Sequence, residues 1–207
     1  MKKVRKGAAG YVRSQRVRRA LVMLIMFAIP IGLYYTALAI TGTQKNVLTI
    51  VAVVGLIPAA RFAVSFIMIM LSREADAEAV AETEKTASAL VRAYELTVTA
   101  YEGRMTFDSI VICGNEVVCC ALGEKKEGLQ EKTALMQKHI NRILNSNGYF
   151  GSNVRIFTDL KHFGERLKQI SADPEKYRSG INFKPDEKYP DLSREELMMH
   201  TIMAISV

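Results

Sequence analysis

The sequence is 207 residues long, which is enough for one or two domains, and its composition is ordinary, with 49% hydrophobic and 24% charged residues. The net charge of +7 is concentrated at the N-terminus. Residues 1–19 carry eight basic side chains and no acid: Lys2, Lys3, Arg5, Lys6, Arg13, Arg16, Arg18 and Arg19. The rest of the chain is nearly neutral, with 20 basic and 21 acidic side chains. This distribution argues against a nucleic-acid-binding domain, which needs a concentrated positive surface.

Two apolar segments follow the basic arm (residues 1–19). Residues 20–41 contain no charged side chain, and residues 47–71 contain only Arg61. About 20 apolar residues in a helix cross the hydrocarbon core of a bilayer, so both segments are long enough to span it. The short connection over 42–46 predicts an antiparallel hairpin. A cleaved signal peptide is the alternative for the first segment, but the segment is too long and is followed at once by a second apolar segment.

The basic residues also predict how this hairpin is oriented. Eight of them precede the first segment, whereas the connection between the segments holds only Lys45. The positive-inside rule therefore predicts a multi-pass protein of the cell membrane with both termini in the cytoplasm. The basic arm is expected to lie against anionic lipid headgroups, where each nearby cation contributes about 1 kcal/mol.

Arg61 lies inside the second apolar segment, where a central charge costs at least ~2.5 kcal/mol. Three interpretations are open. The side chain extends to the cytoplasmic headgroups, or residues 61–71 form an interfacial helix after a short span, or the arginine faces a protein partner. Neither apolar segment contains an acid, so a counter-ion from protein would belong to another chain.

After the second segment the composition becomes that of a soluble domain. Residues 72–94 are rich in alanine and glutamate, which predicts a helix that connects the hairpin to a cytoplasmic domain over 95–207. Alternating apolar residues then predict three strands, over 95–101, 107–113 and 116–122. Short turns separate them, so we expect an antiparallel meander.

Two more helices and a strand are predicted in the following part of the chain. An amphipathic pattern indicates a helix over about 129–145, and VRIFT indicates a strand over 154–158. The next helix begins at Thr158 or Asp159, either of which can cap it. Because a helix crosses over between the third and fourth strands, these two strands are expected to be parallel.

Three prolines predict irregular structure over 171–192, and Ser193 with Glu196 forms a capping box that begins a final helix. The predicted fold is therefore a membrane α-helical hairpin plus an α/β (α+β) cytoplasmic domain. Its short mixed sheet of about four strands is flanked by helices in the order α-β-β-β-α-β-α-α.

The three cysteines predict buried, reduced thiols. Cys113, Cys119 and Cys120 form no Cys-x-x-Cys pair, and the adjacent Cys119 and Cys120 would point to opposite faces of a strand. Reduced thiols suit a cytoplasmic location. The sequence also lacks the glycine-rich loops that bind nucleotides, so no cofactor is expected.

The order of helix, three-strand meander, helix and strand resembles the core of the PD-(D/E)xK nuclease-like fold. In that family an aspartate on the second strand and a Glu-x-Lys motif bind Mg²⁺ and activate water. The resemblance implies Asp108 as the acid, Glu124 and Lys126 as the Glu-x-Lys pair, and Mg²⁺ as cofactor. Such carboxylates would hold the ion for phosphodiester cleavage.

The sequence departs from this motif in three ways. Glu124 lies in the polar segment GEKKEG, which predicts a turn, and the third-strand positions where the family places its acid hold only cysteine and alanine. Phenylalanine rather than proline precedes Asp108. The departures count against an active nuclease. They favour an unrelated α/β layer fold, with a relative of the nuclease fold that has lost its catalytic residues as the alternative.

A second resemblance covers most of the chain. The stretches KNVLTIVAVVGLIPAARFAVSFIMIML and FDSIVICGNEVVCCALGE, read with the basic arm, are similar to small uncharacterised membrane proteins of Gram-positive bacteria. This resemblance implies a bacterial plasma membrane and supplies no catalytic residue.

The sequence favours a non-catalytic, membrane-anchored cytoplasmic module that binds a protein partner or forms homo-oligomers, with the lipid bilayer as its other partner. Two alternatives are kept: a membrane-tethered metal-dependent nuclease or phosphodiesterase that uses Asp108, Glu124 and Lys126, and an accessory subunit of a transport complex. The second alternative follows because two helices cannot enclose a pore by themselves.

Overall fold

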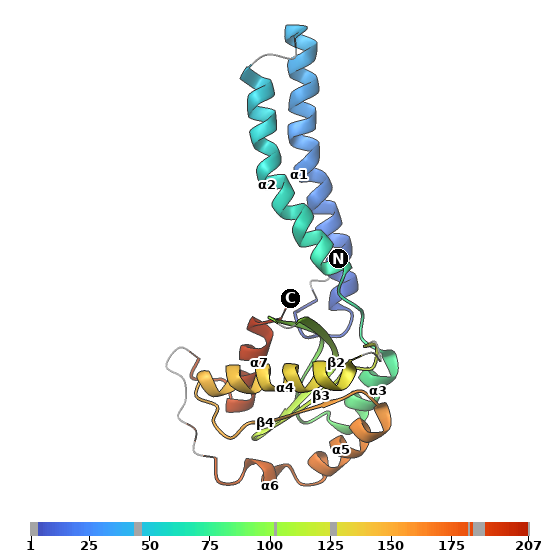
Figure 1. The fold of residues 1–207 in the computed structure, drawn as a ribbon, viewed down its shortest axis with the longest axis vertical. Coiled ribbons are helices and arrows are strands. Elements are labelled where there is room, and N and C mark those ends of the chain that lie inside the picture. The colour runs from blue at the N-terminus through green and yellow to red at the C-terminus, as the bar shows by residue number, and fades with distance from the viewer. Residues whose placement is uncertain are drawn as a thin grey trace. The chain divides into compact units, whose positions relative to one another are not determined.

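The computed structural model describes residues 4–43, 47–101, 103–124, 128–181, 183 and 189–206 (Figure 1). The chain divides into two compact units. Residues 12–72 form the helical hairpin, and residues 1–11 together with 73–207 form an α+β domain, called here the sheet domain.

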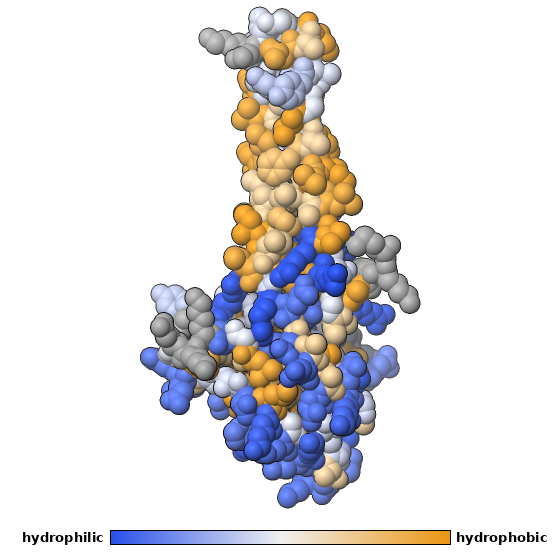
Figure 2. All heavy atoms as spheres, turned by 90° about the vertical axis from the view of Figure 1, so that its right-hand side faces the viewer, coloured by the Kyte–Doolittle hydropathy of each residue, from blue (hydrophilic) through white to orange (hydrophobic). Residues whose placement is uncertain are grey.

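The hairpin consists of α1 (Tyr11–Thr41) and α2 (Val47–Met70), both long and apolar enough to cross a membrane. A Cβ atom on Gly55 of α2 would lie 3.4 Å from the Cβ of Pro30 on α1. Glycine at this position therefore lets the two helices approach closely. Figure 2 shows apolar side chains over much of the visible face of the hairpin.

Helix α1 begins earlier than the apolar segment predicted from sequence, so Arg13, Arg16, Arg18 and Arg19 belong to it. Gly10, with a φ of 80°, immediately precedes the helix, and neither glycine nor proline occurs between it and the apolar segment. Arginine is a good helix former, so the helix extends through the second half of the basic arm.

The sheet domain contains a four-stranded mixed sheet in the order β1-β2-β3-β4. Its strands are β1 (Val91–Ala100), β2 (Gly103–Cys113), β3 (Glu116–Cys120) and β4 (Asn153–Phe157). The first three pair antiparallel, and β4 is parallel to β3. The predicted meander and the parallel fourth strand are therefore confirmed.

Helices cover both faces of this sheet (Figure 1). Side chains of α4 (Leu129–Ser146) and α7 (Arg194–Ala204) complete the core on one face, and those of α3 (Ala77–Thr86) and α5 (Leu160–Ala172) complete it on the other. The central strands β2 and β3 are buried along nearly their whole length because both of their faces are covered.

Two predictions about helices need correction. The helix predicted over 72–94 is too long, because α3 ends at Thr86 and residues 91–94 belong to β1. Pairing with β2 outweighs the helical propensity of that stretch. The region 171–192 is not wholly irregular, because it contains α6 (Pro174–Arg178).

The predicted helix caps are confirmed in the sheet domain. Asp159 caps α5 through its side chain, which accepts the N–H of His162. Ser193 and Glu196 form the reciprocal capping box at the start of α7.

Candidate functional site

Asp108, the predicted metal-binding acid, is fully buried within β2. Its carboxylate accepts the N–H groups of Asp76 at 2.9 Å and Leu122 at 2.7 Å and forms an ion pair with Arg73. A Cβ on Gly123 would lie 1.8 Å from Nη1 of Arg73, so glycine makes room for the guanidinium. Asp108 therefore joins the segment that follows α2 to the loop that follows β3.

Glu124, the second predicted catalytic acid, also has donors close to it. Its carboxylate accepts the N–H of Thr106 on β2 at 3.0 Å and pairs with Lys132 on α4. The side chain thus satisfies a backbone donor of β2 beyond the point where β3 ends. Lys126, the third member of the predicted constellation, lies outside the described residues.

These contacts support structural roles for both acids. Within the described ranges, no three His, Cys, Asp or Glu side chains gather closely enough to hold a metal ion. A divalent cation at Asp108 would have to displace Arg73 and two backbone N–H groups from the carboxylate. Replacing these donors in a buried position carries a large desolvation cost.

In β1 and β2 the alternation of side chains between the two faces of the sheet shifts by one residue at the same level. The side chains that face α4 and α7 have odd numbers up to Ala93 in β1 and up to Phe107 in β2, and even numbers beyond these points. Tyr94 and Ser109 at this level are register partners. Glu95 next to them has a φ of 56°, which is uncommon for a residue other than glycine.

Glu95 and Asp108 occupy facing positions where the register is interrupted, and both are buried. Glu95 accepts the N–H of Gly10 at 2.9 Å, immediately before α1. Asp108 holds Arg73 and the N–H of Asp76, shortly after α2. Two buried acids at facing strand positions therefore anchor both chain segments that lead to the membrane hairpin, an arrangement that the sequence did not predict.

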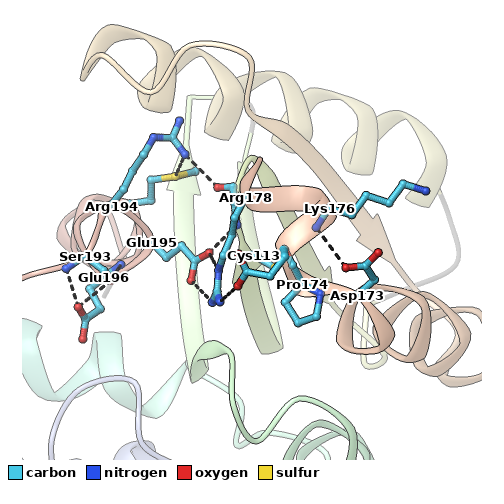
Figure 3. Close-up of polar contacts among 12 residues, drawn as sticks. Cys113, Asp173, Pro174, Lys176, Arg178, Ser193, Arg194, Glu195 and Glu196 are labelled. Atoms are coloured by element: carbon cyan, nitrogen blue, oxygen red, sulfur yellow. Dashed lines mark hydrogen bonds and ion pairs between the residues drawn. The ribbon is translucent and has the colours of Figure 1, made fainter. Parts of the chain in front are cut away.

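The tip of the β2–β3 hairpin is held by a second group of charged residues, called here the α6–α7 clamp (Figure 3). The Glu195 carboxylate accepts the N–H of Gly114 at 2.7 Å and bonds from Nε and Nη2 of Arg178 at 2.9 and 3.0 Å. Arg194 donates to the carbonyl of Gly114 at 2.9 Å. The bonds from Arg178 to Glu195 raise the pKa of the guanidinium above its usual range.

Gly114 fits this clamp because it has no side chain. Its φ is 59°, and an added Cβ would lie 1.9 Å from the carbonyl oxygen of Tyr177. Sequence reasoning missed the clamp, although Asp173 followed by Pro174 is a typical start of a helix and marks α6.

The cysteines are buried and free, as predicted from their spacing. Burial, with a smaller contribution from Glu195, raises the pKa of Cys113 to about 11. Burial also raises the pKa of Cys119 and of Cys120 far above the ordinary thiol value. The neutral thiol is therefore stable in all three, which argues against a nucleophilic role at neutral pH.

The protein covers the β1 edge of its sheet with segments from both ends of the chain. The carbonyl of Gly7 accepts the N–H of Tyr94 at 2.8 Å, and Ser206 forms an isolated bridge with Val98. The Lys6 ammonium donates to the Ser206 carbonyl at 2.6 Å and to that of Met203 at 2.8 Å. These contacts leave little of this edge for another chain.

The β4 edge is arranged differently. Among the described residues, β4 pairs only with β3. The N–H of Asn153 and the carbonyl of Phe157 point toward β3, where both are bonded. By alternation, the backbone groups of Val154 and Ile156 point to the outer side. Val154 is fully buried, so the accessible part of this strand edge is at Ile156, which is partly exposed.

A trench of about 560 Å³ runs beside this edge, between α4 and β4. Its lining residues are mostly neutral and polar: Leu129, Gln130, Thr133, Ala134, Gln137, Ile156 and Thr158. The hydroxyl oxygen of Thr133 is buried and has no hydrogen-bond partner among the described residues. Because a buried polar atom usually has a partner, Thr133 marks the trench as a place for added donors or acceptors.

The basic arm is divided between the two units. Arg5 and Lys6 belong to the sheet domain, whereas Lys2 and Lys3 lie outside the described residues. The arginines of α1 belong to the hairpin, where Arg16 donates to the carbonyl of Ser72 at 2.6 Å. The interaction of the arm with headgroups stays a prediction, and Lys6 has the additional contacts described above.

Comparisons of the chain with protein-family models, with curated proteins and with solved structures find no match. The similarities to the PD-(D/E)xK fold and to membrane proteins of Gram-positive bacteria therefore stay resemblances of motif and element order.

Proposed function

We propose that this protein is a membrane-anchored cytoplasmic module that binds an extended segment of a protein partner along β4. The observation that carries the proposal is the difference between the two sheet edges. The β1 edge is covered by both ends of the chain, whereas the β4 edge is open beside a polar trench.

Strand addition would satisfy the groups that this edge presents. An added strand would bond to the outward N–H and C=O groups of Ile156, which supply affinity without regard to sequence. Gln130, Gln137 and the hydroxyl of Thr133 would then select among side chains through the trench. Open strand edges are hazardous in proteins that have no use for them, so an edge left open beside a trench favours a binding role.

In this proposal the hairpin fixes the sheet domain to the cytoplasmic surface. Both of its helices have the length and hydropathy of membrane spans. The concentration of arginines at the N-terminal end of α1 favours a cytoplasmic location for both termini. Anchoring holds the module at the membrane, where it meets partners that are also membrane proteins.

A second copy of this chain is a less favourable occupant of the β4 edge. Antiparallel pairing of two β4 strands about their centre would place Arg155 opposite its own copy. Like charges in directly opposite positions destabilise a strand pair. Arg155 lies 3.8 Å from Glu116 on β3, but about half of its side chain is exposed. A partner segment with an acid at the facing position would therefore pair with it more favourably than a second Arg155.

A metal-dependent phosphodiesterase is not favoured, because Arg73 and two N–H groups surround the Asp108 carboxylate. An accessory role in a transport complex is compatible with the proposal, because such a complex would itself supply the partner segment.

The test is site-specific photo-cross-linking in the full chain, expressed in bacterial membranes. A photoreactive residue replaces Gln137 in the trench or, as a matched control, Gln169, which is exposed on α5. We expect a discrete adduct from position 137 and none from 169. The adduct should disappear with Ile156→Pro, which removes an outward N–H and leaves the bonds between β3 and β4 intact.

The outcome is decided by the mass of the adduct, by the position from which it forms and by its loss in the Ile156→Pro variant. An adduct with twice the mass of the chain would show that the partner is a second copy of this chain and not a different protein. Equal cross-linking from both positions, or an adduct that persists in an Ile156→Pro variant with a wild-type melting profile, would refute binding at β4.

A further inference from the structure

The hairpin contains a small cationic groove between its two helices. The groove has a volume of about 190 Å³ and is lined by Gln15, Arg18, Arg19, Val22, Phe62 and Ser65. The α1 residues recur at helical spacing, so they form one face directed at α2. One guanidinium is fixed in place, because Nη1 of Arg19 donates to the carbonyl of Ser65 at 3.0 Å.

The charges around this groove have no counter-ion within the hairpin. Residues 12–72 include Arg13, Arg16, Arg18, Arg19, Lys45 and Arg61 but no aspartate or glutamate. Within the described part of the chain, the side chains of Arg18 and Arg61 make no hydrogen bond or ion pair. Arg61 precedes Ser65 by one helical turn, so it lies on the same side of α2.

We propose that this groove binds the phosphate of an anionic phospholipid, with Arg18 and Arg19 as its principal ligands and Arg61 reaching it from deeper in the bilayer. The inference rests on the membrane insertion that the proposed function assumes. Guanidinium groups bind phosphate through paired, charge-assisted hydrogen bonds, and the amide of Gln15 and the hydroxyl of Ser65 supply further donors.

The apolar residues of the groove favour a lipid over free phosphate. Val22 and Phe62 line it together with the arginines, so an occupant meets both apolar and cationic surface. A phospholipid offers both features, since its acyl chains continue from the phosphate into the hydrocarbon. The four residues from Arg61 to Ser65 rise about 6 Å at 1.5 Å per residue, a distance that the long side chain of Arg61 can cover toward the headgroup.

The proposal also accounts for a charge in the second apolar segment. An arginine in the hydrocarbon is costly, and the cost falls when the side chain extends to the interface and meets an anion. A phosphate held by Arg18 and Arg19 would supply that anion where the hairpin itself has none.

The experiment measures lipid that stays bound to the full chain after extraction from bacterial membranes in mild detergent, by native mass spectrometry. The double variant Arg18→Gln/Arg19→Gln should retain phosphatidylglycerol at a level at least about tenfold lower than the wild type, as expected for the loss of strong charge-assisted bonds. Arg61→Gln should cause a smaller loss. The control Arg5→Gln/Arg13→Gln removes the same charge outside the groove and should retain lipid within about twofold of wild type.

Further measurements distinguish the ways in which the lipid-site proposal could fail. Adding millimolar inorganic phosphate should leave the bound lipid in place, and displacement of the lipid would show that the site takes free phosphate. Equal retention by the two double variants would refute the groove as a lipid site while membrane anchoring stands. Recovery of the wild-type chain in the soluble fraction without detergent would refute both this inference and the anchored module.

Discussion

At the scale of single residues, the donors around a carboxylate decide what it can do. Asp108 occupies a strand position at which an acid can bind a metal, but a guanidinium and two backbone N–H groups already point at its oxygens. Such a carboxylate has its oxygens occupied by donors and is enclosed by protein. Asp108 is therefore expected to contribute to the stability of the fold.

The first prediction concerns this role of Asp108. Asp108→Asn should lower the free energy of unfolding by about 3 kcal/mol, because the amide removes the negative charge opposite Arg73 and cannot accept from all three donors. Denaturant unfolding of the full chain in detergent micelles measures this loss. The matched control is Asp159→Asn, which should change little because asparagine caps a helix as well as aspartate does. Equal stability of the two variants would contradict the structural role.

The second prediction concerns the reactivity of the cysteines. Cys113 has a pKa of about 11, so at pH 8 its thiolate fraction is about a hundredfold lower than that of an ordinary thiol. Iodoacetamide should therefore label the native chain very slowly at pH 8 and label all three cysteines after unfolding. Fast labelling of one cysteine in the native chain would contradict the burial described here.

The same pKa shift gives a pH dependence with a defined sign. The pKa of Cys113 is higher in the folded than in the unfolded chain, so the unfolded chain loses its proton first as the pH rises. The contribution of Cys113 to stability is thus fully present below about pH 8.5 and decreases between this pH and about 11.

The sequence identified several important residue types but not their partners. The sequence indicates Asp108 as an important acid, yet its ion-pair partner Arg73 lies 35 residues away in a stretch that predicts a helix. Glu195 lies 81 residues from Gly114, whose N–H it accepts. Local patterns report on neighbours within a few residues, so contacts over such distances depend on the completed fold.

At the scale of elements, the β2–β3 hairpin shows how a turn can depend on distant helices. Glycine at the turn was expected from the sequence. The structure adds that the backbone of α6 and the first turn of α7 pack directly against that glycine. The turn and the two helices should therefore unfold together.

The third prediction separates backbone strain from steric conflict at this turn. Gly114→Ala should lower the free energy of unfolding by more than about 2 kcal/mol, because the new methyl group overlaps the Tyr177 carbonyl in addition to the strain of a positive φ. Gly180→Ala is the control, since Gly180 also has a positive φ but faces open space. It should cost only about 1 kcal/mol in the same unfolding assay. Equal losses would argue against the close approach of α6.

Periodicity predicted the elements well where one pattern dominated. Apart from α6, the order of the elements followed from the sequence, as did the parallel fourth strand and the capping box of α7. The length of α3 did not, because the apolar residues from Leu90 to Tyr94 suit either a helix or a strand. The phase change at Glu95 was also invisible, because nearly every position around it is buried.

At the scale of the whole molecule, the two ends of the chain close one side of the sheet domain. Residues near the N-terminus run beside β1, and Ser206 bridges to the same strand. The segment that leads into α1 is therefore part of the folded domain. Its integrity decides whether the sheet has one open edge or two.

The fourth prediction follows from this closure. Lys6→Met should lower the free energy of unfolding by about 1–2 kcal/mol, because the ammonium bonds to two carbonyls at the C-terminal end of α7, where a cation is also favoured by the helix dipole. Arg5→Met is the control: it removes the same charge from an exposed neighbour and should have little effect. Hydrogen exchange should show faster exchange of the β1 amides, including Tyr94, only in the Lys6 variant.

This loosening should also change association, because an uncovered β1 edge presents backbone groups that a second chain can pair with. The Lys6→Met variant should therefore form concentration-dependent oligomers in detergent, whereas the Arg5→Met variant should keep the wild-type elution volume on size exclusion. Faster β1 exchange without oligomers would mean that Ser206 alone still blocks the edge. Unchanged exchange in Lys6→Met would show instead that the Lys6 contacts are not needed to keep the β1 edge closed. Binding of a partner at β4 and not at β1 would then have another cause.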